Sequence, residues 1–306
     1  MNHGRNVQRR KLTVMPTTTL LLIDVQKDFH PGGSLAIPTA NEDAERIAAF
    51  IRSNGSKIDR IVATLDSHHK LHIAHPGFWL AEDSTTHPNP FTIITSQEIA
   101  EGKWRPNPKV KISNDLLDES EFLGMSSVLD DSGTIDATKY AIEYTKRLEE
   151  KGRFKLCVWP EHCLIGSPGF CLVDMVREAI DIWSQTTGGS VEWVLKGQNL
   201  LTEMYSALEA EVPVSKSTSF NVQLQKSLVE SDKLLVCGQA MSHCVNYTLR
   251  DIVSRWPEDQ THKISLLKDC ASPVPGFEEA GENLQVEMAA AGVKVQKVSE
   301  VFAVSP

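Results

Sequence analysis

Short apolar runs alternate with amphipathic stretches along this chain, and the alternation strongly constrains its fold. Three runs rich in Val, Ile and Leu predict buried parallel strands at residues 19–23, 60–65 and 233–237. Weaker runs predict further strands at 155–158, 191–195, 263–267 and 294–298. Between the runs, apolar residues recur on one helical face at 41–53, 171–183, 245–256 and 277–291. We therefore expect a three-layer α/β/α fold with a mainly parallel central sheet, similar to a Rossmann fold.

Residues 77–154 depart from this alternation. The segment holds several prolines, a Thr/Ser-rich start and an acidic stretch near 115–121, and it predicts one helix, at 137–151. Connections in compact domains are usually about 4–6 residues long. We therefore interpret 77–154 as an insertion within a single domain that spans 1–306. The polar residues 1–16 predict a flexible tail.

Charge and hydropathy exclude two classes of partner. The net charge is −9 and no basic stripe offsets it, which argues against binding to nucleic acid. No stretch approaches the ~20 apolar residues of a membrane helix, and no apolar signal sequence begins the chain, so we expect a cytoplasmic protein. The six cysteines all follow position 156 without a CxxC motif, which favours reduced thiols over disulfides.

Chemically useful side chains follow the ends of the expected strands. In open α/β sheets, ligands bind beyond the carboxyl ends of the strands, so residues placed there are candidates for a common site. The candidates selected in this way are Asp24, Asp66, His68, Trp159, His162, Lys196 and Cys244.

Each candidate also has an ordinary structural interpretation. Asp24 can cap a turn, Lys196 can be a solvated lysine, and Cys244 can be a buried small apolar residue. The Asp66-x-His68 pair supplies two ligands, which do not make a metal site. Together, however, the candidates supply a base, an electrostatic activator, a nucleophile and a metal site.

Four motifs resemble those of a known family. They are DVQKDFHPGGSLAIP at 24–38, DSHHKLHIAH at 66–75, WPEHC at 159–163 and GQAMSHCV at 238–245. In this order they are similar to the motifs of the isochorismatase-like cysteine hydrolases. The PGG turn and the WPEHC motif resemble those of the nicotinamidase and pyrazinamidase branch. KDCASP at 268–273 fits the strand end that follows, and the resemblance covers most of the chain outside 1–16 and 77–154.

The resemblance implies roles for individual residues. The catalytic triad would be Asp24, Lys196 and Cys244. Lys196 and the start of the following helix would stabilise the thiolate of Cys244. The backbone N–H groups of Ala240 and Cys244 would form an oxyanion hole, with a cis peptide bond before Ala240.

The resemblance also implies a metal and a flat substrate. One divalent cation would bind Asp66, His68 and His162; these ligand types favour zinc, and iron or manganese would also fit. Phe29 and Trp159 would flank an aromatic ring.

The implied reaction is hydrolysis of nicotinamide to nicotinate and ammonia through a thioester on Cys244. The partner would be a small amide, and the chain could form a homo-oligomer. A second interpretation is hydrolysis of another small amide or carbamate by the same triad. Isochorismate cleavage is less favoured, because a vinyl ether needs no thiol nucleophile. The non-enzyme alternative is a metal-binding or interaction module with a relict site.

Two further features depart from the family pattern or have no assigned role. His243 precedes the nucleophile where relatives often carry an aromatic residue such as Tyr. We count it among the candidate substrate-binding residues, with a hydrogen-bond donor, an extra base and simple packing as the other interpretations. His69, His72 and His75 have no assigned role, and we expect them to support the loop or the ligands.

Overall fold

The computed structural model describes residues 17–303 except 114–115, 119–121 and 123–124. The expected flexible tail at 1–16 and part of the acidic stretch near 115–121 lie outside the described residues. Within the described part of the chain, no helix is both long enough and apolar enough to cross a membrane.

A six-stranded parallel sheet forms the centre of the molecule, in the order β10-β9-β8-β1-β2-β7. Its strands are β1 (Thr18–Ile23), β2 (Arg60–Asp66), β7 (Glu192–Lys196), β8 (Lys233–Gly238), β9 (Ile264–Leu267) and β10 (Lys294–Gln296). Strands β1 and β8 are almost completely buried, as expected for a parallel sheet covered on both faces. The sheet confirms the predicted strands, with the exception of 155–158.

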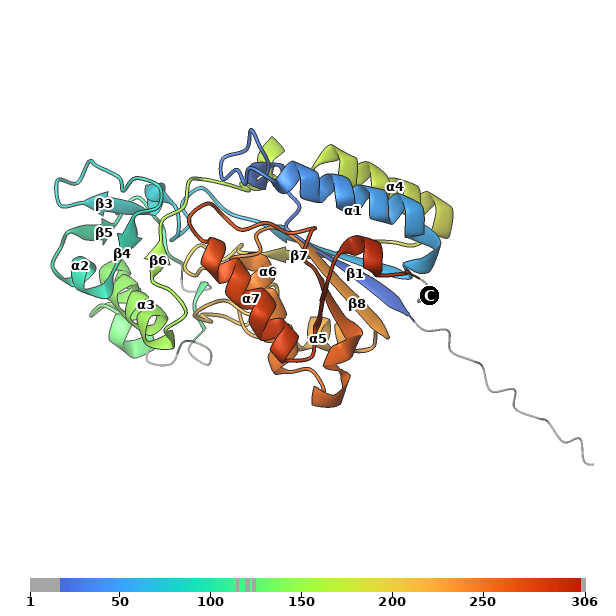
Figure 1. Ribbon diagram of the computed structural model, residues 1–306. Helices are drawn as coiled ribbons and strands as arrows, with labels where there is room; N and C mark the ends of the chain where they lie inside the picture. Colours follow the sequence, from blue (N-terminus) through green and yellow to red (C-terminus); the bar gives the residue numbers. More distant parts are fainter. Residues whose placement is uncertain (1–16, 114–115, 119–121, 123–124, 304–306) are drawn as a thin grey trace, which may run out of the picture.

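Helices cover both faces of the sheet (Figure 1). One face carries α1 (Ala40–Asn54) and α4 (Asp174–Thr187), and the other carries α5 (Val222–Val229), α6 (Cys244–Ser254) and α7 (Glu278–Ala290). Side chains of β1 alternate between the two apolar cores, with Leu20 and Leu22 packed towards α1 and Leu21 and Ile23 on the opposite face. The three-layer α/β/α architecture is therefore confirmed.

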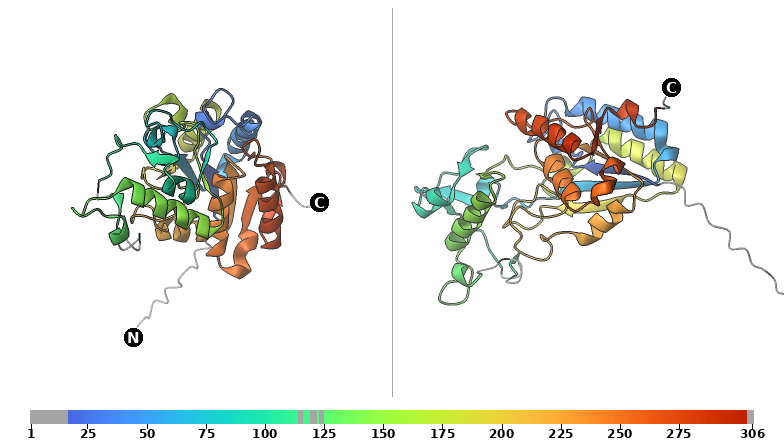
Figure 2. Two further views of the ribbon diagram at one scale, coloured as in Figure 1. Left: turned by 90° about the vertical axis from the view of Figure 1, so that its left-hand side faces the viewer. Right: turned by 60° about the horizontal axis from the view of Figure 1, so that its bottom comes forward.

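Residues 77–154, interpreted above as an insertion and called the inserted segment below, build a lobe beyond the carboxyl ends of the strands (Figures 1 and 2). It contains β3 (Trp79–Ala81), β4 (Ile93–Ile94), α2 (Ser96–Ala100), β5 (Trp104–Pro106) and α3 (Ala137–Lys151). The predicted helix at 137–151 is confirmed. Tyr140, Tyr144 and Leu148 of α3 are fully buried in the same apolar core as the sheet, so the lobe packs directly onto the main body.

The prediction of a sheet strand at 155–158 is wrong. Only β6 (Leu156–Cys157) forms there, and it pairs antiparallel with β4 in a separate two-stranded sheet. The run is apolar because Leu156 and Val158 are buried in the core that the lobe shares with the main body. Trp159 and His162 are consequently delivered by a loop and not by the end of a sheet strand.

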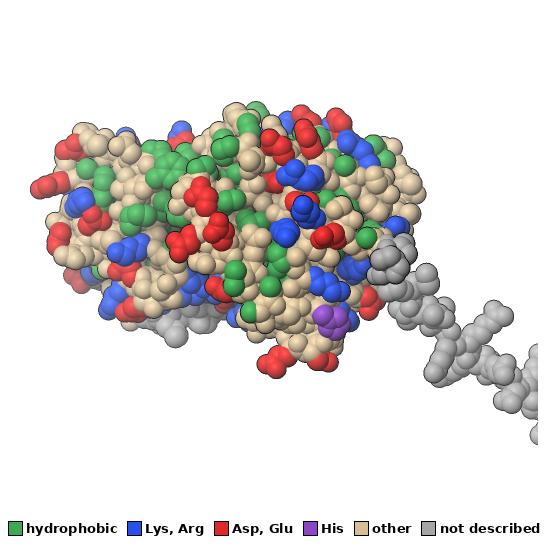
Figure 3. Space-filling model, viewed as in Figure 1, with side chains coloured by type: hydrophobic (Ala, Val, Ile, Leu, Met, Phe, Trp, Pro, Cys, Tyr) green, Lys and Arg blue, Asp and Glu red, His purple; other side chains and the backbone are tan. Residues whose placement is uncertain are grey.

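Charged side chains of both signs are interspersed over the face of the molecule shown in Figure 3. Ion pairs of α1 and α4 illustrate this mixing: Arg52 lies 3.9 Å from Glu178, and Arg177 lies 2.7 Å from Asp181. These surface pairs contribute little stability.

Candidate active site

Asp24 directly follows β1 and is fixed by the neighbouring strand β2. Its backbone N–H donates to Thr64 Oγ1 at 3.1 Å, and the Thr64 hydroxyl donates to Asp24 Oδ1 at 2.6 Å. The side chain is completely buried, and φ of 45° turns the chain sharply away from the strand. Oδ2 is thereby left to face the ammonium group of Lys196.

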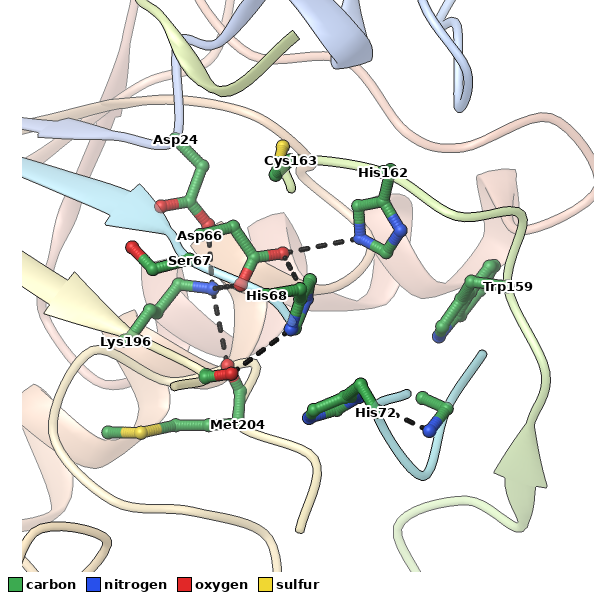
Figure 4. A network of polar contacts seen from close by, with 12 residues as sticks. Asp24, Asp66, Ser67, His68, His72, Trp159, His162, Cys163, Lys196 and Met204 are labelled. Atoms are coloured by element: carbon green, nitrogen blue, oxygen red, sulfur yellow. Dashed lines mark hydrogen bonds and ion pairs between the residues drawn. The ribbon is translucent and has the colours of Figure 1, made fainter. Parts of the chain in front are cut away.

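Lys196, the last residue of β7, lies at the centre of a buried polar group (Figure 4). Its Nζ lies 2.8 Å from Asp24 Oδ2, 3.1 Å from Asp66 Oδ1 and 3.4 Å from Cys244 Sγ. It also donates to the carbonyl oxygen of Met204 at 3.2 Å. Burial acts to lower the pKa of Lys196, but the two carboxylates outweigh it and the pKa is raised. The side chain is therefore a buried, charged ammonium.

Cys244 begins α6 and is buried beside both acids. Ligand atoms of Asp24, Asp66 and Cys244 lie within 4.8 Å of one another. Burial raises the pKa of the Cys244 thiol well above its usual range, although Lys196 acts in the opposite direction. Lys196 therefore favours the thiolate, as expected, but burial outweighs its effect and the resting group is the thiol. Burial also raises the pKa of Asp24, which makes this carboxylate a stronger base for the thiol proton.

Two backbone N–H groups flank the thiol. The peptide bond between Gln239 and Ala240 is cis, as the family resemblance implied. The carbonyl of Ala240 accepts from the N–H of Val245 at 3.0 Å, which folds the turn back onto the start of α6. Within the described residues, the N–H groups of Ala240 and Cys244 have no acceptor. Both remain available for an oxygen atom of a ligand.

Asp66, at the end of β2, lies between two histidines. Its Oδ2 is 3.0 Å from His68 Nε2 and 3.3 Å from His162 Nε2. Gln26 anchors the backbone of Asp66: the amide Nε2 donates to the carbonyl at 2.8 Å, and Oε1 accepts from the N–H at 2.7 Å. The three predicted metal ligands are therefore brought together, although His162 arrives on a loop.

Backbone carbonyl groups orient the two histidines so that Nε2 of each ring faces Asp66. His68 Nδ1 lies 3.1 Å from the carbonyl oxygen of Gly197, and His162 Nδ1 lies 2.8 Å from that of Pro160. A carbonyl oxygen can only accept, so each Nδ1 carries a proton, and Nε2 is the nitrogen that could bind a cation after giving up any proton it shares with Asp66. Such second contacts commonly orient histidine ligands, and the residues fit a divalent cation with open positions.

A small cavity lies between the Cys244 thiol and the cluster of Asp66, His68 and His162. The side chains that line it are Phe29, Leu35, Asp66, Trp159, His162, Glu203, Tyr205, Ala240, His243, Cys244 and Val274. The orientation of the Trp159 ring is fixed by a hydrogen bond from its Nε1 to Tyr205 Oη at 2.9 Å. The predicted residues Phe29 and Trp159 therefore both face the cavity, whose aromatic walls suit a flat ring.

His243 belongs to the aromatic wall. Its ring lies 5.1 Å from that of Trp159 and 4.8 Å from that of Phe277, measured between centroids. Burial lowers its pKa to about 4, so the ring is neutral near neutral pH. Nδ1 lies 2.8 Å from the Ser242 hydroxyl. His243 therefore serves as a neutral wall of the cavity.

The three histidines without assigned roles differ in their environments. His69 is exposed. His72 uses both ring nitrogens, one 3.0 Å from the carbonyl of Thr202 and one accepting from the N–H of Ala74 at 3.2 Å. His75 is buried beside His68, at 5.1 Å between ring centroids, and neither nitrogen has a hydrogen-bond partner within the described part of the chain.

Sequence reasoning missed Glu203 as a residue of the site. Its side chain is 2% exposed; Oε1 accepts from the N–H of Met204 at 2.9 Å, while Oε2 has no hydrogen-bond partner among the described residues. Burial raises the pKa of Glu203, and the charges that act on it next are those of His68, Asp66 and His162. The sequence offered no clear signal, because the stretch that follows Lys196 also holds other polar and acidic residues, such as Asn199, Glu209 and Glu211.

Comparison with known proteins supports the family resemblance. The chain is 22% identical over 290 residues to the nicotinamidase of Escherichia coli K12, covering 94% of this chain and 97% of the relative. No family model matches the chain.

Solved nicotinamidases have the same fold. The yeast nicotinamidase Pnc1p bound to the inhibitor nicotinaldehyde superposes with a TM-score of 0.58, at 19% identity, over 92% of this chain and 100% of that chain. The nicotinamidase of Acinetobacter baumanii superposes with a TM-score of 0.57, at 18% identity, over 94% of this chain and 100% of that chain. The pyrazinamidase of Pyrococcus horikoshii in complex with zinc superposes with a TM-score of 0.51, at 20% identity, over 92% of this chain and 99% of that chain. The chain therefore has the α/β fold of the solved nicotinamidases over nearly its whole length.

Proposed function

We propose that this protein is a cysteine amidohydrolase that converts nicotinamide and water to nicotinate and ammonia. The observation that carries the proposal is the position of Lys196, whose Nζ is 2.8 Å from Asp24 Oδ2 and 3.4 Å from Cys244 Sγ. A nucleophile, its base and a buried cation thus meet at the floor of an aromatic cavity. The likeness to nicotinamidases in sequence and fold supports this function.

In the first half of the reaction, Asp24 takes the proton of the Cys244 thiol as the sulfur attacks the amide carbon. The carbonyl oxygen becomes an oxyanion, which the free N–H groups of Ala240 and Cys244 hold. Such donors typically contribute about 3–4 kcal/mol to the transition state. Lys196 compensates the negative charge of the sulfur and of Asp24. Asp24 then returns the proton to the leaving nitrogen, so ammonia departs and a thioester on Cys244 remains.

In the second half, Asp24 takes a proton from a water molecule that attacks the thioester carbon. The tetrahedral oxyanion is held by the same N–H groups, and its collapse expels the Cys244 sulfur. The acid product is released, and the proton on Asp24 returns to the sulfur. The same three side chains therefore serve both halves of the cycle, with Asp24 alternating between base and acid.

Asp66, His68 and His162 would hold one divalent cation at the wall of the cavity. When bound, such a cation supplies Lewis acidity that can position a ring nitrogen and lower the pKa of a water molecule. Zinc suits two imidazoles and one carboxylate, and iron or manganese would also fit. The zinc complex of the Pyrococcus horikoshii pyrazinamidase is in line with zinc.

A second candidate function is hydrolysis of another small amide or carbamate by the same triad. It is favoured by one observation: Glu203 reaches the cavity from a loop whose backbone is bound by Tyr144 of the inserted segment, at 3.0 Å. The segment that departs from the family pattern therefore helps to form the substrate wall. In this interpretation, Glu203 and Tyr205 would select the substrate.

The test is ammonia release from nicotinamide. Wild-type protein and Cys171→Ala should be active, because Cys171 is exposed and lies outside the cavity, whereas Cys244→Ala should be inactive. Chelation should remove activity, and added zinc should restore it. Activity that survives Cys244→Ala would contradict the mechanism. An inactive wild type that still binds metal and is alkylated at Cys244 would favour the second candidate, to be tested with a panel of small amides.

A further inference from the structure

The loop that follows Lys196 holds a buried acid that the proposed mechanism does not use. Glu203 faces the cavity together with Asp66 and His162. Its Oε1 accepts from the N–H of Met204, and its Oε2 has no hydrogen-bond partner within the described residues. A buried carboxylate without a partner is costly, so the position calls for a cation or a donor that the protein chain does not supply.

The backbone around Glu203 is firmly positioned. Its N–H donates to Tyr144 Oη at 3.0 Å, and its carbonyl accepts from the N–H of Glu211 at 2.9 Å. The next residue, Met204, accepts from Lys196 Nζ at 3.2 Å through its carbonyl. The loop is therefore tied on one side to the inserted segment and on the other to the centre of the polar group. The free oxygen of Glu203 is held in place and is not a mobile surface group.

The balance of charge in the buried site indicates which kind of partner the free oxygen of Glu203 requires. Asp24 and Lys196 form an ion pair with no net charge. Asp66 and Glu203 are the remaining acids that line the cavity, and together they carry a charge of −2 when both are ionised. With His68 and His162 neutral, one divalent cation balances this charge, whereas Asp66 alone would leave a buried excess of positive charge.

We propose that Glu203 is a further residue of the metal centre, whose buried carboxylate supplies the second negative charge that retains a divalent cation beside Asp66, His68 and His162. This inference rests on the metal site of the proposed function. Glu203 acts here as a positioning residue through charge and hydrogen bonding. Residues in this role typically change metal affinity by about 10–100-fold when they are replaced.

The experiment measures zinc binding to metal-free protein, without substrate, by calorimetric titration or by competition with a chromophoric chelator. Glu203→Gln keeps the shape of the side chain and removes its charge. The matched control is Glu211→Gln, because Glu211 is also a buried acid, 1% exposed, with both carboxylate oxygens lacking hydrogen-bond partners within the described residues. Asp66→Asn serves as the reference for loss of the site.

Zinc should bind about 10–100-fold more weakly to Glu203→Gln than to wild type, and equally well to Glu211→Gln. Metal-free Glu203→Gln should unfold at the same temperature as wild type or above it, because it no longer buries an unpaired carboxylate, and zinc should raise its unfolding temperature less. This second measurement separates a weakened metal site from a misfolded one. Glu203→Asp, which keeps the charge, should retain more affinity than Glu203→Gln.

Unchanged zinc affinity in Glu203→Gln, with binding lost in Asp66→Asn, would overturn the role of Glu203 and leave the metal site intact. Equal zinc binding by wild type and Asp66→Asn would overturn the metal site itself, and the role of Glu203 with it. The two failures are therefore distinguishable without any measurement of activity.

Discussion

The ammonium nitrogen of Lys196 lies 2.8 Å from Asp24 Oδ2, and both side chains are completely shielded from solvent. The pair joins the ends of two strands, β7 and β1, that are separated in the sheet by β2. A buried ion pair is seldom a net source of stability, yet loss of one partner leaves the other charge uncompensated. Catalysis and stability therefore depend on the same contact.

Replacement of Lys196 by Met should abolish activity and destabilise the fold by about 3–5 kcal/mol, because Asp24 and Asp66 would both lose their buried counterion. The double variant Lys196→Met/Asp24→Asn should recover part of this loss while remaining inactive. Urea unfolding of wild type, both single variants and the double variant measures the coupling. Strictly additive effects would show that the two side chains do not interact in solution.

Gly238 should not tolerate a side chain. Its φ of 121° lies in the region that favours glycine, and a Cβ there would overlap the carbonyl oxygen of Ile23 in the neighbouring strand. Gly238→Ala should therefore destabilise the protein by roughly 3 kcal/mol or more, as strain and overpacking add. Gly276→Ala is the control, with φ of 85° and open space around the Cβ position; about 1 kcal/mol is expected from its backbone conformation alone. Similar losses in the two variants would argue against the close packing of β8 on β1.

Glu211 should make stability fall as pH rises. Burial raises the pKa of its carboxyl from 4.5 to about 8, although Lys151 and Arg153 oppose the shift. Between these values the folded protein holds a proton that the unfolded chain has lost, so this contribution to the free energy of unfolding decreases with rising pH. The free energy of unfolding of Glu211→Gln should therefore rise, relative to that of wild type, by on the order of a few kcal/mol between about pH 5 and pH 9. Urea unfolding across this range tests the sign, and parallel pH profiles for the two proteins would contradict it.

Tyr205→Phe should impair substrate binding more than turnover. The substitution removes the acceptor of Trp159 Nε1 and leaves a buried indole N–H without a partner, at a cost of about 1–3 kcal/mol. The indole then loses its fixed orientation in the cavity wall, so KM should rise several-fold with a smaller change in kcat. Steady-state kinetics with nicotinamide give the two constants. A fall in kcat at constant KM would place Tyr205 in the chemistry and not in the wall.

The sequence was sufficient to predict the residues that follow strands of the main sheet. Asp24, Asp66 and Lys196 come directly after or at the ends of long apolar runs, and parallel strands bring such ends to one edge. Cys244 could be placed for the same reason, because a short turn separates it from β8. These positions follow from strand periodicity and from the rule that parallel strands share a direction.

The parts that could not be predicted depend on partners that are distant in sequence. Residues 155–158 are as apolar as a sheet strand, and periodicity does not reveal that β6 pairs with β4 of the inserted segment. Glu203 looks like an ordinary surface acid until Tyr144 and Met204 are seen to hold it against the cavity. The resting state of the Cys244 thiol also depended on burial, which outweighs the nearby charge of Lys196.

Helix α3 binds the loop that follows β7 through two tyrosine hydroxyls. Tyr140 donates to the carbonyl of Leu201 at 2.5 Å, and Tyr144 accepts from the backbone N–H of Glu203 at 3.0 Å. Two phenolic oxygens therefore connect the lobe to the loop that contacts Lys196. Any change in the packing of the lobe would therefore also displace the loop that carries Glu203, beside Lys196.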